Sequence, residues 1–336
     1  MLTTNLPDLA SALRLQSQSQ TVRADIDRTA RELTTGVSAD VRALTQGDLA
    51  PVFGIDRELS GIDLALQDLG LAEARSAAAQ TALEVVADRG GTLGTEIIGA
   101  AGRGDPVSRD SLVATGEAVL RTMVSSLNTE FGGASLFSGT ALDTGALASA
   151  DQLLSDIQAL LAGATTPADA QNAIDLYFDT PGGAFETTIY TGSNADAAGV
   201  AIDDDNRLSY LPRADDPALR EALKSIVMVA AAGSASFSND PEAYNSYLVD
   251  AGTRLQESAE AVTGVRAALG QAQEQIAEAI DTREAERTTL AAARNDLIGV
   301  DQFDAAAKLA ELESQLEALY LITGRISNLS LTNYLR

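Results

Sequence analysis

The side chains that carry most enzyme chemistry are scarce in this chain of 336 residues. It contains no histidine and no cysteine, so the usual general base near neutral pH, a thiolate nucleophile and the commonest metal ligands are missing. Disulfide bonds are excluded for the same reason. Carboxylates, arginines, hydroxyl groups and two lysines, Lys224 and Lys308, remain for chemistry. Composition therefore argues against a thiol-dependent or histidine-dependent enzyme.

Two short patterns resemble ligand-binding motifs. The run Asp203–Asp204–Asp205 lacks the spaced ligands, the central glycine and the terminal glutamate of an EF-hand calcium loop. It separates two β-rich segments, which predicts a solvated hairpin turn. The tripeptide Arg103–Gly104–Asp105, which integrin ligands use, lies in a glycine-rich turn and is attributed to chance, because short motifs often match by accident. We predict no metal site and no cofactor.

The remaining candidates for catalysis lack supporting residues. Ser138–Gly139 is not a nucleophile elbow, because the glycine two residues before the serine is missing. Lys224–Ser225 is an adjacent lysine–serine pair without the further groups that a catalytic site requires. The glycines of residues 90–94 are not followed by the lysine of a phosphate-binding loop. We therefore predict no catalytic residue and no enzymatic activity.

The charge of the chain excludes further classes of partner. With 23 basic and 48 acidic residues, its net charge is −25, which argues against nucleic acid and against anionic membrane surfaces. Self-repulsion of this size favours solubility. No apolar run approaches the ~20 residues of a transmembrane helix. The N-terminus lacks a basic region and an apolar stretch, so we expect no cleaved signal peptide.

Periodicity predicts a mainly α chain. Hydrophobic residues make up 45% of it and aromatic residues only 4%, which favours thin alanine- and leucine-rich helices. We predict helices over residues 1–35, 54–90, 106–129, 149–162, 167–178, 217–232, 241–298 and 300–336. Gly90–Gly91 is expected to interrupt a helix, residues 185–191 to form a strand, and residues 200–202 and 207–211 to form a hairpin.

These elements predict a long antiparallel coiled-coil or helical-bundle rod with paired terminal helices and a small α+β insertion. The predicted terminal coiled-coil domain comprises residues 1–36 and 300–336. The predicted helical rod domain comprises residues 50–140 and 241–299, and the insertion comprises residues 141–240, facing outward.

Both ends of the chain carry a heptad seam, in which apolar residues recur at steps of three and four. A helix with one apolar face is marginal in water without a partner. We predict that the seam residues make partner contacts: Leu13, Leu15, Val22, Ile26, Leu33, Leu309, Leu312, Leu316, Leu319, Ile322, Ile326 and Leu329.

Two interpretations of the seams stay open. The terminal helices either pair only within one chain, or also pack against other molecules. The C-terminal helix has apolar residues on a second flank, including Leu321 and Ile322, whereas a two-helix seam needs only the narrower stripe. The sequence therefore favours packing between chains.

Three groups of residues resemble the bacterial flagellin superfamily, and more narrowly the flagellin-like hook-associated proteins of the hook–filament junction. Residues 32–36 resemble an N-terminal element of the family. Residues 127–140 resemble a run that is characteristic of the junction proteins. The C-terminal helix is similar to the terminal signature of the family at Ala307–Lys308–Leu309, Leu319–Tyr320, Arg325–Ile326 and residues 328–335.

This resemblance covers residues 1–140 and 241–336 and implies a structural role in an extracellular flagellum. Proteins of this family are exported unfolded by the type III route, with a chaperone holding the terminal helix, and their paired terminal helices form the inner core of a tube. The expected partners are further copies of the chain, another hook-associated protein and flagellin. A filament flagellin is the first alternative, and a secreted coiled-coil scaffold unrelated to flagella is the second.

Overall fold

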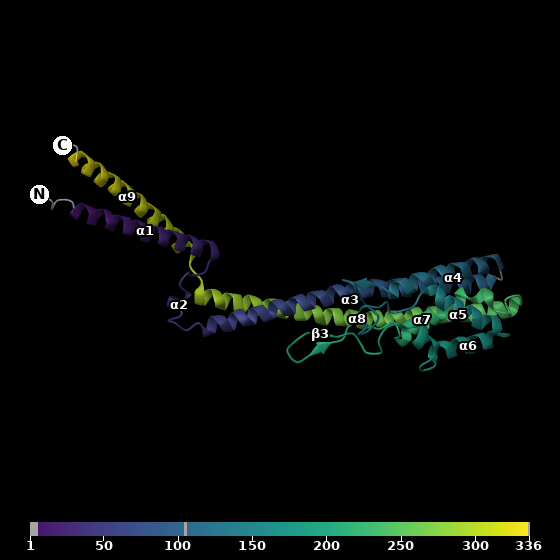
Figure 1. The fold of residues 1–336 in the computed structure, drawn as a ribbon. Helices are drawn as coiled ribbons and strands as arrows, with labels where there is room; N and C mark the ends of the chain where they lie inside the picture. Colours follow the sequence, from purple (N-terminus) through teal and green to yellow (C-terminus); the bar gives the residue numbers. More distant parts are fainter. Residues whose placement is uncertain (1–5, 104–105, 335–336) are drawn as a thin grey trace. The chain divides into compact units, whose positions relative to one another are not determined.

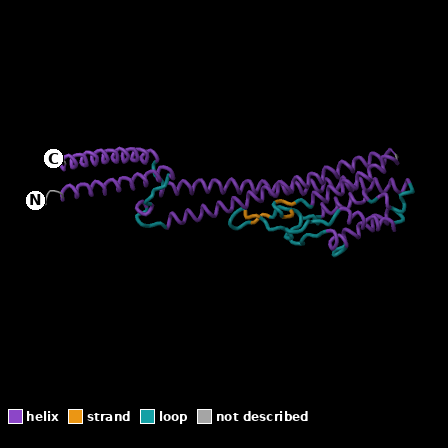
Figure 2. Tube along the Cα trace, turned by 45° about the horizontal axis from the view of Figure 1, so that its top comes forward, coloured by secondary structure: helices purple, strands orange, loops and turns teal. Residues whose placement is uncertain are grey.

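The computed structural model describes the backbone of residues 6–103 and 106–334, and their side chains except at 6–9, 11, 12, 106–109 and 326–334. Over these residues the chain is mainly α-helical with few short strands (Figures 1 and 2), as predicted. None of the described helices combines the length and the apolarity needed to cross a membrane. Two compact units make up the chain: a terminal unit, Met1–Leu64 with Arg283–Arg336, and a central unit, Ala65–Thr282.

The terminal unit is built from the two ends of the chain. The linkers beside its long helices have clear local causes. Gly36 follows the first helix with φ of 70°, a left-handed conformation that glycine adopts without strain. Asp301 accepts a hydrogen bond of 2.7 Å from the backbone N–H of Phe303 and so begins the last helix. The helices are α1 (Leu6–Thr35), α2 (Val41–Leu44), the first part of α3 (Ala50–Arg103), the last part of α8 (Pro241–Ile298), and α9 (Gln302–Tyr334).

The central unit contains the rest of α3 and α8 and shorter elements between them. Three of the shorter helices begin at a sequence signal for capping: Ser149 caps α5, Thr166 and Asp169 form a capping box on α6, and Asp216 precedes Pro217 of α7. The helices are α4 (Pro106–Leu127), α5 (Ala150–Gly163), α6 (Pro167–Asp179), η1 (Phe185–Ile189), α7 (Pro217–Ala230) and η2 (Ala232–Ser234). The strands are β1 (Glu130–Phe131), β2 (Ala134–Ser135), β3 (Val200–Ala201) and β4 (Arg207–Leu208).

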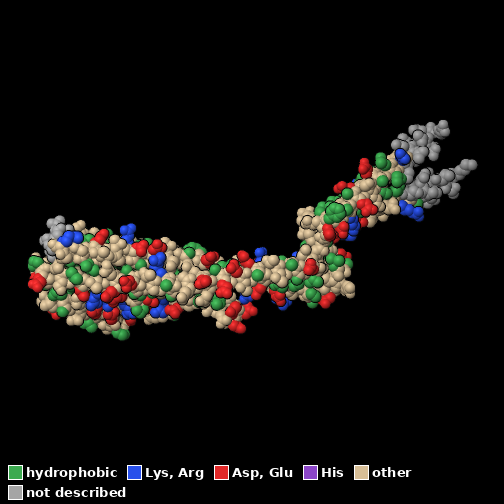
Figure 3. All heavy atoms as spheres, turned by 180° about the vertical axis from the view of Figure 1, so that it is seen from behind, with side chains coloured by type: hydrophobic (Ala, Val, Ile, Leu, Met, Phe, Trp, Pro, Cys, Tyr) green, Lys and Arg blue, Asp and Glu red, His purple; other side chains and the backbone are tan. Residues whose placement is uncertain are grey.

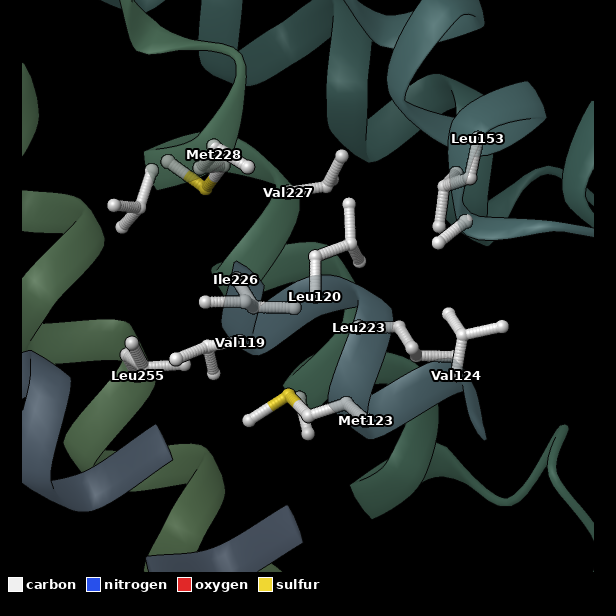
Figure 4. Packing of buried hydrophobic residues seen from close by; sticks show 14 of the residues in the cluster. Val119, Leu120, Met123, Val124, Leu153, Leu223, Ile226, Val227, Met228 and Leu255 are labelled. Carbon is white, nitrogen blue, oxygen red and sulfur yellow. The ribbon is translucent and has the colours of Figure 1, made fainter. Parts of the chain in front are cut away.

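The main core of the central unit lies where α4, α5, α7 and α8 meet. Figure 4 shows Leu120 and Met123 of α4 in one cluster with Leu223 and Ile226 of α7, and Leu255 of α8 at its side next to Val119. These side chains are all buried. Helix α7 is buried on almost every side, which explains why its sequence is apolar over most of its length.

Glycines allow two pairs of helices in this unit to approach closely. A Cβ atom added at Gly94 of α3 would lie 2.8 Å from the carbonyl oxygen of Gly252 in α8. One added at Gly116 of α4 would lie 2.8 Å from a methyl carbon of Val229 in α7. Both distances are too short for a carbon contact, so these helices pack backbone against backbone.

Two short antiparallel hairpins accompany the helices. Strands β1 and β2 pair across Gly132 and Gly133, whose φ angles of 63° and 78° fit the tight turn that joins them. Strands β3 and β4 pair Val200 with Leu208, and their apolar side chains join a second cluster with Leu69 of α3 and Ile276 of α8. The second hairpin agrees with the sequence prediction, whereas the first was not predicted.

Two predicted features are wrong. Residues 185–191 do not form a strand, because Phe185 to Ile189 form a π-helical turn that buries both ends, with the Phe185 ring stacked 5.0 Å from that of Phe178. Gly90–Gly91 does not interrupt α3. Gly90 lies against Met123 and Leu255 instead, so the glycine makes room for neighbouring helices. The predicted division into terminal, rod and insertion domains stays a prediction.

Candidate assembly interface

Helices α1 and α9 lie side by side and antiparallel in the terminal unit (Figures 1 and 2). The two helices form a seam with heptad spacing along the facing sides. The less exposed positions of α1 include Leu15, Val22, Ile26, Thr29 and Leu33, and those of α9 are Ala305, Leu309, Leu312, Leu316 and Leu319. The pairing brings together most of the residues for which the sequence predicted partner contacts.

Burial along this seam is incomplete. Among the nominated residues only Val22 is buried, with 7% of its surface exposed. Leu15, Ile26, Leu33, Leu309, Leu312, Leu316 and Leu319 are half-buried. Leu13 and Ile322 are exposed, with 57% and 46% of their surface accessible, and the side chains of Ile326 and Leu329 lie outside the described part of the structure. One partner helix therefore covers each seam only in part.

Sequence reasoning missed two small residues of this seam. Thr29 and Ala305 are the most buried side chains described in α1 and α9, at 2% and 4% exposed. Thr29 lies three residues after Ile26 and four before Leu33, and Ala305 lies four before Leu309. Heptad spacing counted without regard to residue size would have included both.

A contact between polar side chains fixes the relative position of the two helices. The Arg23 guanidinium donates to the hydroxyl of Tyr320, with Nε 2.7 Å from the oxygen. The same guanidinium carbon lies 5.4 Å from the centre of the Tyr320 ring, within the range of a cation–π interaction. This pair reports the register of α1 against α9.

The linkers that follow α1 and precede α9 also pair with one another. Val37 and Gly299 form an isolated antiparallel bridge, in which Ser38 N–H donates to the Ile298 carbonyl at 2.9 Å and Val300 N–H donates to the Gly36 carbonyl at 3.0 Å. We call residues 36–38 and 298–300 the linker bridge. It ties together the two points at which the chain enters and leaves the helix pair.

Large apolar side chains remain exposed on the terminal unit. Phe303 and Leu321 of α9 are 81% and 64% exposed, and Phe53 and Leu64 of α3 are similarly open. Figure 3 shows hydrophobic patches on the helix pair beside the residues drawn in grey. Exposed apolar surface of this kind marks interaction sites, so the terminal unit has a surface suited to binding further protein.

Charge is divided unequally between the units. The terminal unit carries 12 basic and 17 acidic residues, and the central unit carries 11 and 31. The net charge is therefore −5 in the first and −20 in the second. Like charges oppose close packing of identical surfaces, so the terminal unit is the more favourable place for contact between copies.

The residues that the sequence singled out for possible chemistry have structural roles where they are described. Asp203 accepts hydrogen bonds from the backbone N–H groups of Asp205 and Asn206 and shapes the turn between β3 and β4. Ser138 is buried and donates to the Ala141 carbonyl at 2.7 Å. Gly104 and Asp105 lie outside the described residues. No group of metal-binding side chains occurs among the residues that the structure describes.

Lys224 connects two helices of the central unit. Its side chain is 5% exposed, and its Nζ lies 2.8 Å from a carboxylate oxygen of Asp179, 2.7 Å from Glu221 and 3.2 Å from Asp175. Burial opposes the charged form, but hydrogen bonds to Asp179 and Glu221 outweigh it and raise the pKa of Lys224. A lysine held in its charged form by carboxylates is no nucleophile, so it acts as a tie between α6 and α7.

Comparison with known proteins agrees with this architecture. Residues 253–335 match the family of the bacterial flagellin C-terminal helical region. A solved structure described as a flagellar hook-associated protein of Vibrio parahaemolyticus is similar, with a TM-score of 0.51 and 14% identity over 73% of this chain and 95% of that one. No curated protein sequence matches the chain. The family match thus covers the C-terminal quarter of the chain, and the likeness to the solved structure is one of fold.

Proposed function

We propose that this chain is a structural adaptor of the bacterial flagellum, which joins hook to filament by helical self-assembly through its terminal helices. The observation that carries the proposal is the half-buried seam between α1 and α9, with apolar residues exposed on its outer side. Such a surface is stable in water only when further helices cover it. The role is structural, in agreement with both comparisons.

The junction role is preferred over the filament role on two grounds. Residues 127–140 resemble junction proteins, and the similar solved structure is described as hook-associated. A junction protein assembles to a limited extent and requires hook and filament proteins as neighbours, whereas a filament flagellin polymerises alone into long filaments. Electron microscopy of the purified chain at high concentration distinguishes them, because long filaments without partners would overturn the junction role.

The proposal includes a route to the assembly site. The chain would be exported by the flagellar type III apparatus with its termini unpaired. A chaperone would hold the C-terminal helix until export. Incomplete burial of the seam is consistent with helices that order fully only on assembly. Its location would then be extracellular, in the flagellum, with another hook-associated protein and flagellin as neighbours.

Substitution of Leu316 by aspartate tests the role of the seam. Leu316 is half-buried between α1 and α9, and a carboxylate there loses its water without gaining a partner. We expect assembly to be abolished, while the thermal unfolding of the central unit stays unchanged. Leu176→Asp is the matched control, because Leu176 lies in α6 of the central unit and is 68% exposed. Normal assembly of the Leu316 variant would contradict the proposal.

A further inference from the structure

The outward side of α9 carries a second apolar line. Phe303 and Leu321 are separated by 18 residues, which is five helical turns, so they lie on one line along the helix. Leu312 lies halfway between them in sequence and points to the opposite side, toward α1. At 81% and 64% exposed, Phe303 and Leu321 have no part in the seam with α1. This outer line therefore belongs to a different contact.

Unpaired carboxylates accompany the outer line of α9. Glu313 and Glu317 are exposed and lie one turn apart, and Glu311 is exposed nearby. Among the residues that the structure describes, none of the three forms an ion pair, whereas carboxylates elsewhere in the terminal unit, such as Asp56 and Asp63, pair with arginines of α8. The outer side of α9 thus combines apolar anchors with net negative charge.

Helix α1 has an outward side of the opposite charge. Leu13 and Arg31 are also 18 residues apart, so they too share one line along their helix. Leu13 is 57% exposed. Arg31 has no ion-pair partner among the described residues, and the exposed Arg28 pairs only with its own neighbour Asp25, at 3.3 Å. Arg31 lies on this line, while Arg28 and the exposed Asp27 flank it on opposite sides, so the outward side of α1 presents an apolar residue and a net positive charge.

We propose that the outward side of α1 in one copy docks on the outward side of α9 in the next copy. The inference rests on the proposed self-assembly and names the faces that perform it. Arg28 and Arg31 would approach Glu313 and Glu317, and the apolar residues of both lines would be covered. The occupant is a second copy because the chain itself carries both complementary faces.

Charge also disfavours the symmetric alternatives. Two α9 faces brought together would oppose carboxylates to carboxylates, and two α1 faces would oppose arginines to arginines, which is unfavourable. The contact between unlike faces pairs a surface of net positive charge with one of net negative charge. Such a contact is head-to-tail, so it leaves one free face at each end and generates a ring or an open helix. This is the kind of symmetry that a tubular structure requires.

A charge-swap experiment tests the contact in the full-length chain. One variant carries Arg28→Glu with Arg31→Glu, and the other carries Glu313→Arg with Glu317→Arg. None of these four side chains lies in the seam between α1 and α9, so pairing within the chain is kept, which helical content by circular dichroism verifies. As a matched control, Arg42→Glu with Arg57→Glu reverses two exposed charges elsewhere in the terminal unit.

Sedimentation and light scattering then measure assembly. Each variant alone should need at least about tenfold more protein for half-maximal assembly, since two attractions become repulsions. An equimolar mixture of the two should assemble like the wild type, because each variant keeps the face that suits the other. Wild-type assembly by each variant alone, or no recovery in the mixture, would overturn the proposed contact. A wild-type chain that stays monomeric at every concentration, with hook and filament proteins present as well, would instead overturn self-assembly itself.

Discussion

Replacing Gly36 by valine should release the register of the terminal helices. Gly36 has φ of 70°, and a residue with a side chain in this left-handed conformation costs about 1–2 kcal/mol. If the linker bridge opens in response, two backbone hydrogen bonds are lost, each contributing about 0.5–1.5 kcal/mol net. Opening the bridge relieves the strain at the cost of these bonds, so the two energies are not added, and the native register loses about 1–2 kcal/mol of preference, a factor of about 5–30 in population.

Thiol crosslinking measures this register directly, because the chain has no cysteine of its own. Arg23→Cys with Tyr320→Cys places two thiols at the contact that the structure shows. Gln16→Cys or Ala30→Cys, each with Tyr320→Cys, reports a slip by one heptad in either direction, which moves α1 by about 10 Å. A short bismaleimide should join only the first pair in the wild-type background. In the Gly36→Val background that product should fall and slipped products should appear.

A second glycine separates the linker bridge from general backbone strain. Gly47 has φ of 91° and no neighbour within 4 Å of an added Cβ atom, so Gly47→Val introduces similar strain away from the bridge. Its crosslinking pattern should match that of the wild type. If Gly36→Val also keeps the wild-type pattern, the seam alone determines the register and the reasoning about the linker bridge is wrong.

Further predictions concern the central unit. Lys224→Met should lower the free energy of unfolding by about 1–2 kcal/mol, because it leaves carboxylates facing one another in a partly exposed site. Arg121→Met, the control, breaks an ion pair whose side chains are 52% and 75% exposed and should change the free energy of unfolding by less than about 0.5 kcal/mol. Chemical denaturation measures both variants. The pKa of Lys224 is raised above its ordinary value of 10.5, so its contribution to the free energy of unfolding should be fully present below pH 10.5 and disappear as pH rises through the folded-state pKa. A difference between wild type and Lys224→Met that stays constant up to strongly alkaline pH would contradict this. Gly116→Ala should destabilise the central unit by about 1–3 kcal/mol through overpacking against α7. A Cβ added at Gly264 meets no atom within 4 Å, so Gly264→Ala should stabilise the unit by up to about 1 kcal/mol. Equal melting temperatures of the two variants would refute the packing argument.

The long helices were predictable because they depend on local signals. The predicted range 241–298 coincides with α8, and Gly36 ends α1 as expected. Heptad spacing and glycine breaks act within a few turns of one helix, so a single sequence reveals them. The segment 185–189 was wrong because its alternation of apolar and polar residues fits both a strand and a π-helical turn. Contact between Phe185 and Phe178, which the sequence does not reveal, decides between them.

The interface residues were predictable in type but not in their division between two contacts. The sequence identifies leucines such as Leu312 and Leu321 as apolar positions of one helix, and only the placement of α1 shows that the first faces α1 and the second faces away. Thr29 and Ala305 were missed because burial depends on position along the seam, whereas hydrophobicity depends on residue type. Register likewise requires a partner helix, and the Arg23–Tyr320 contact has no local sequence signal.

The unequal charge of the two units gives a physical reason for the arrangement of the interface. Identical copies that pack through their central units would bring together surfaces with a net charge of −20 each, whereas terminal units carry −5 each. Repulsion between like charges grows with the product of the charges, so it is about sixteen times weaker between terminal units at equal separation. Apolar burial by Phe303 and Leu321 can overcome the weaker repulsion, and opposite charges on α1 and α9 can offset it locally. The same chain can therefore repel its copies over most of its surface and still bind them at its ends.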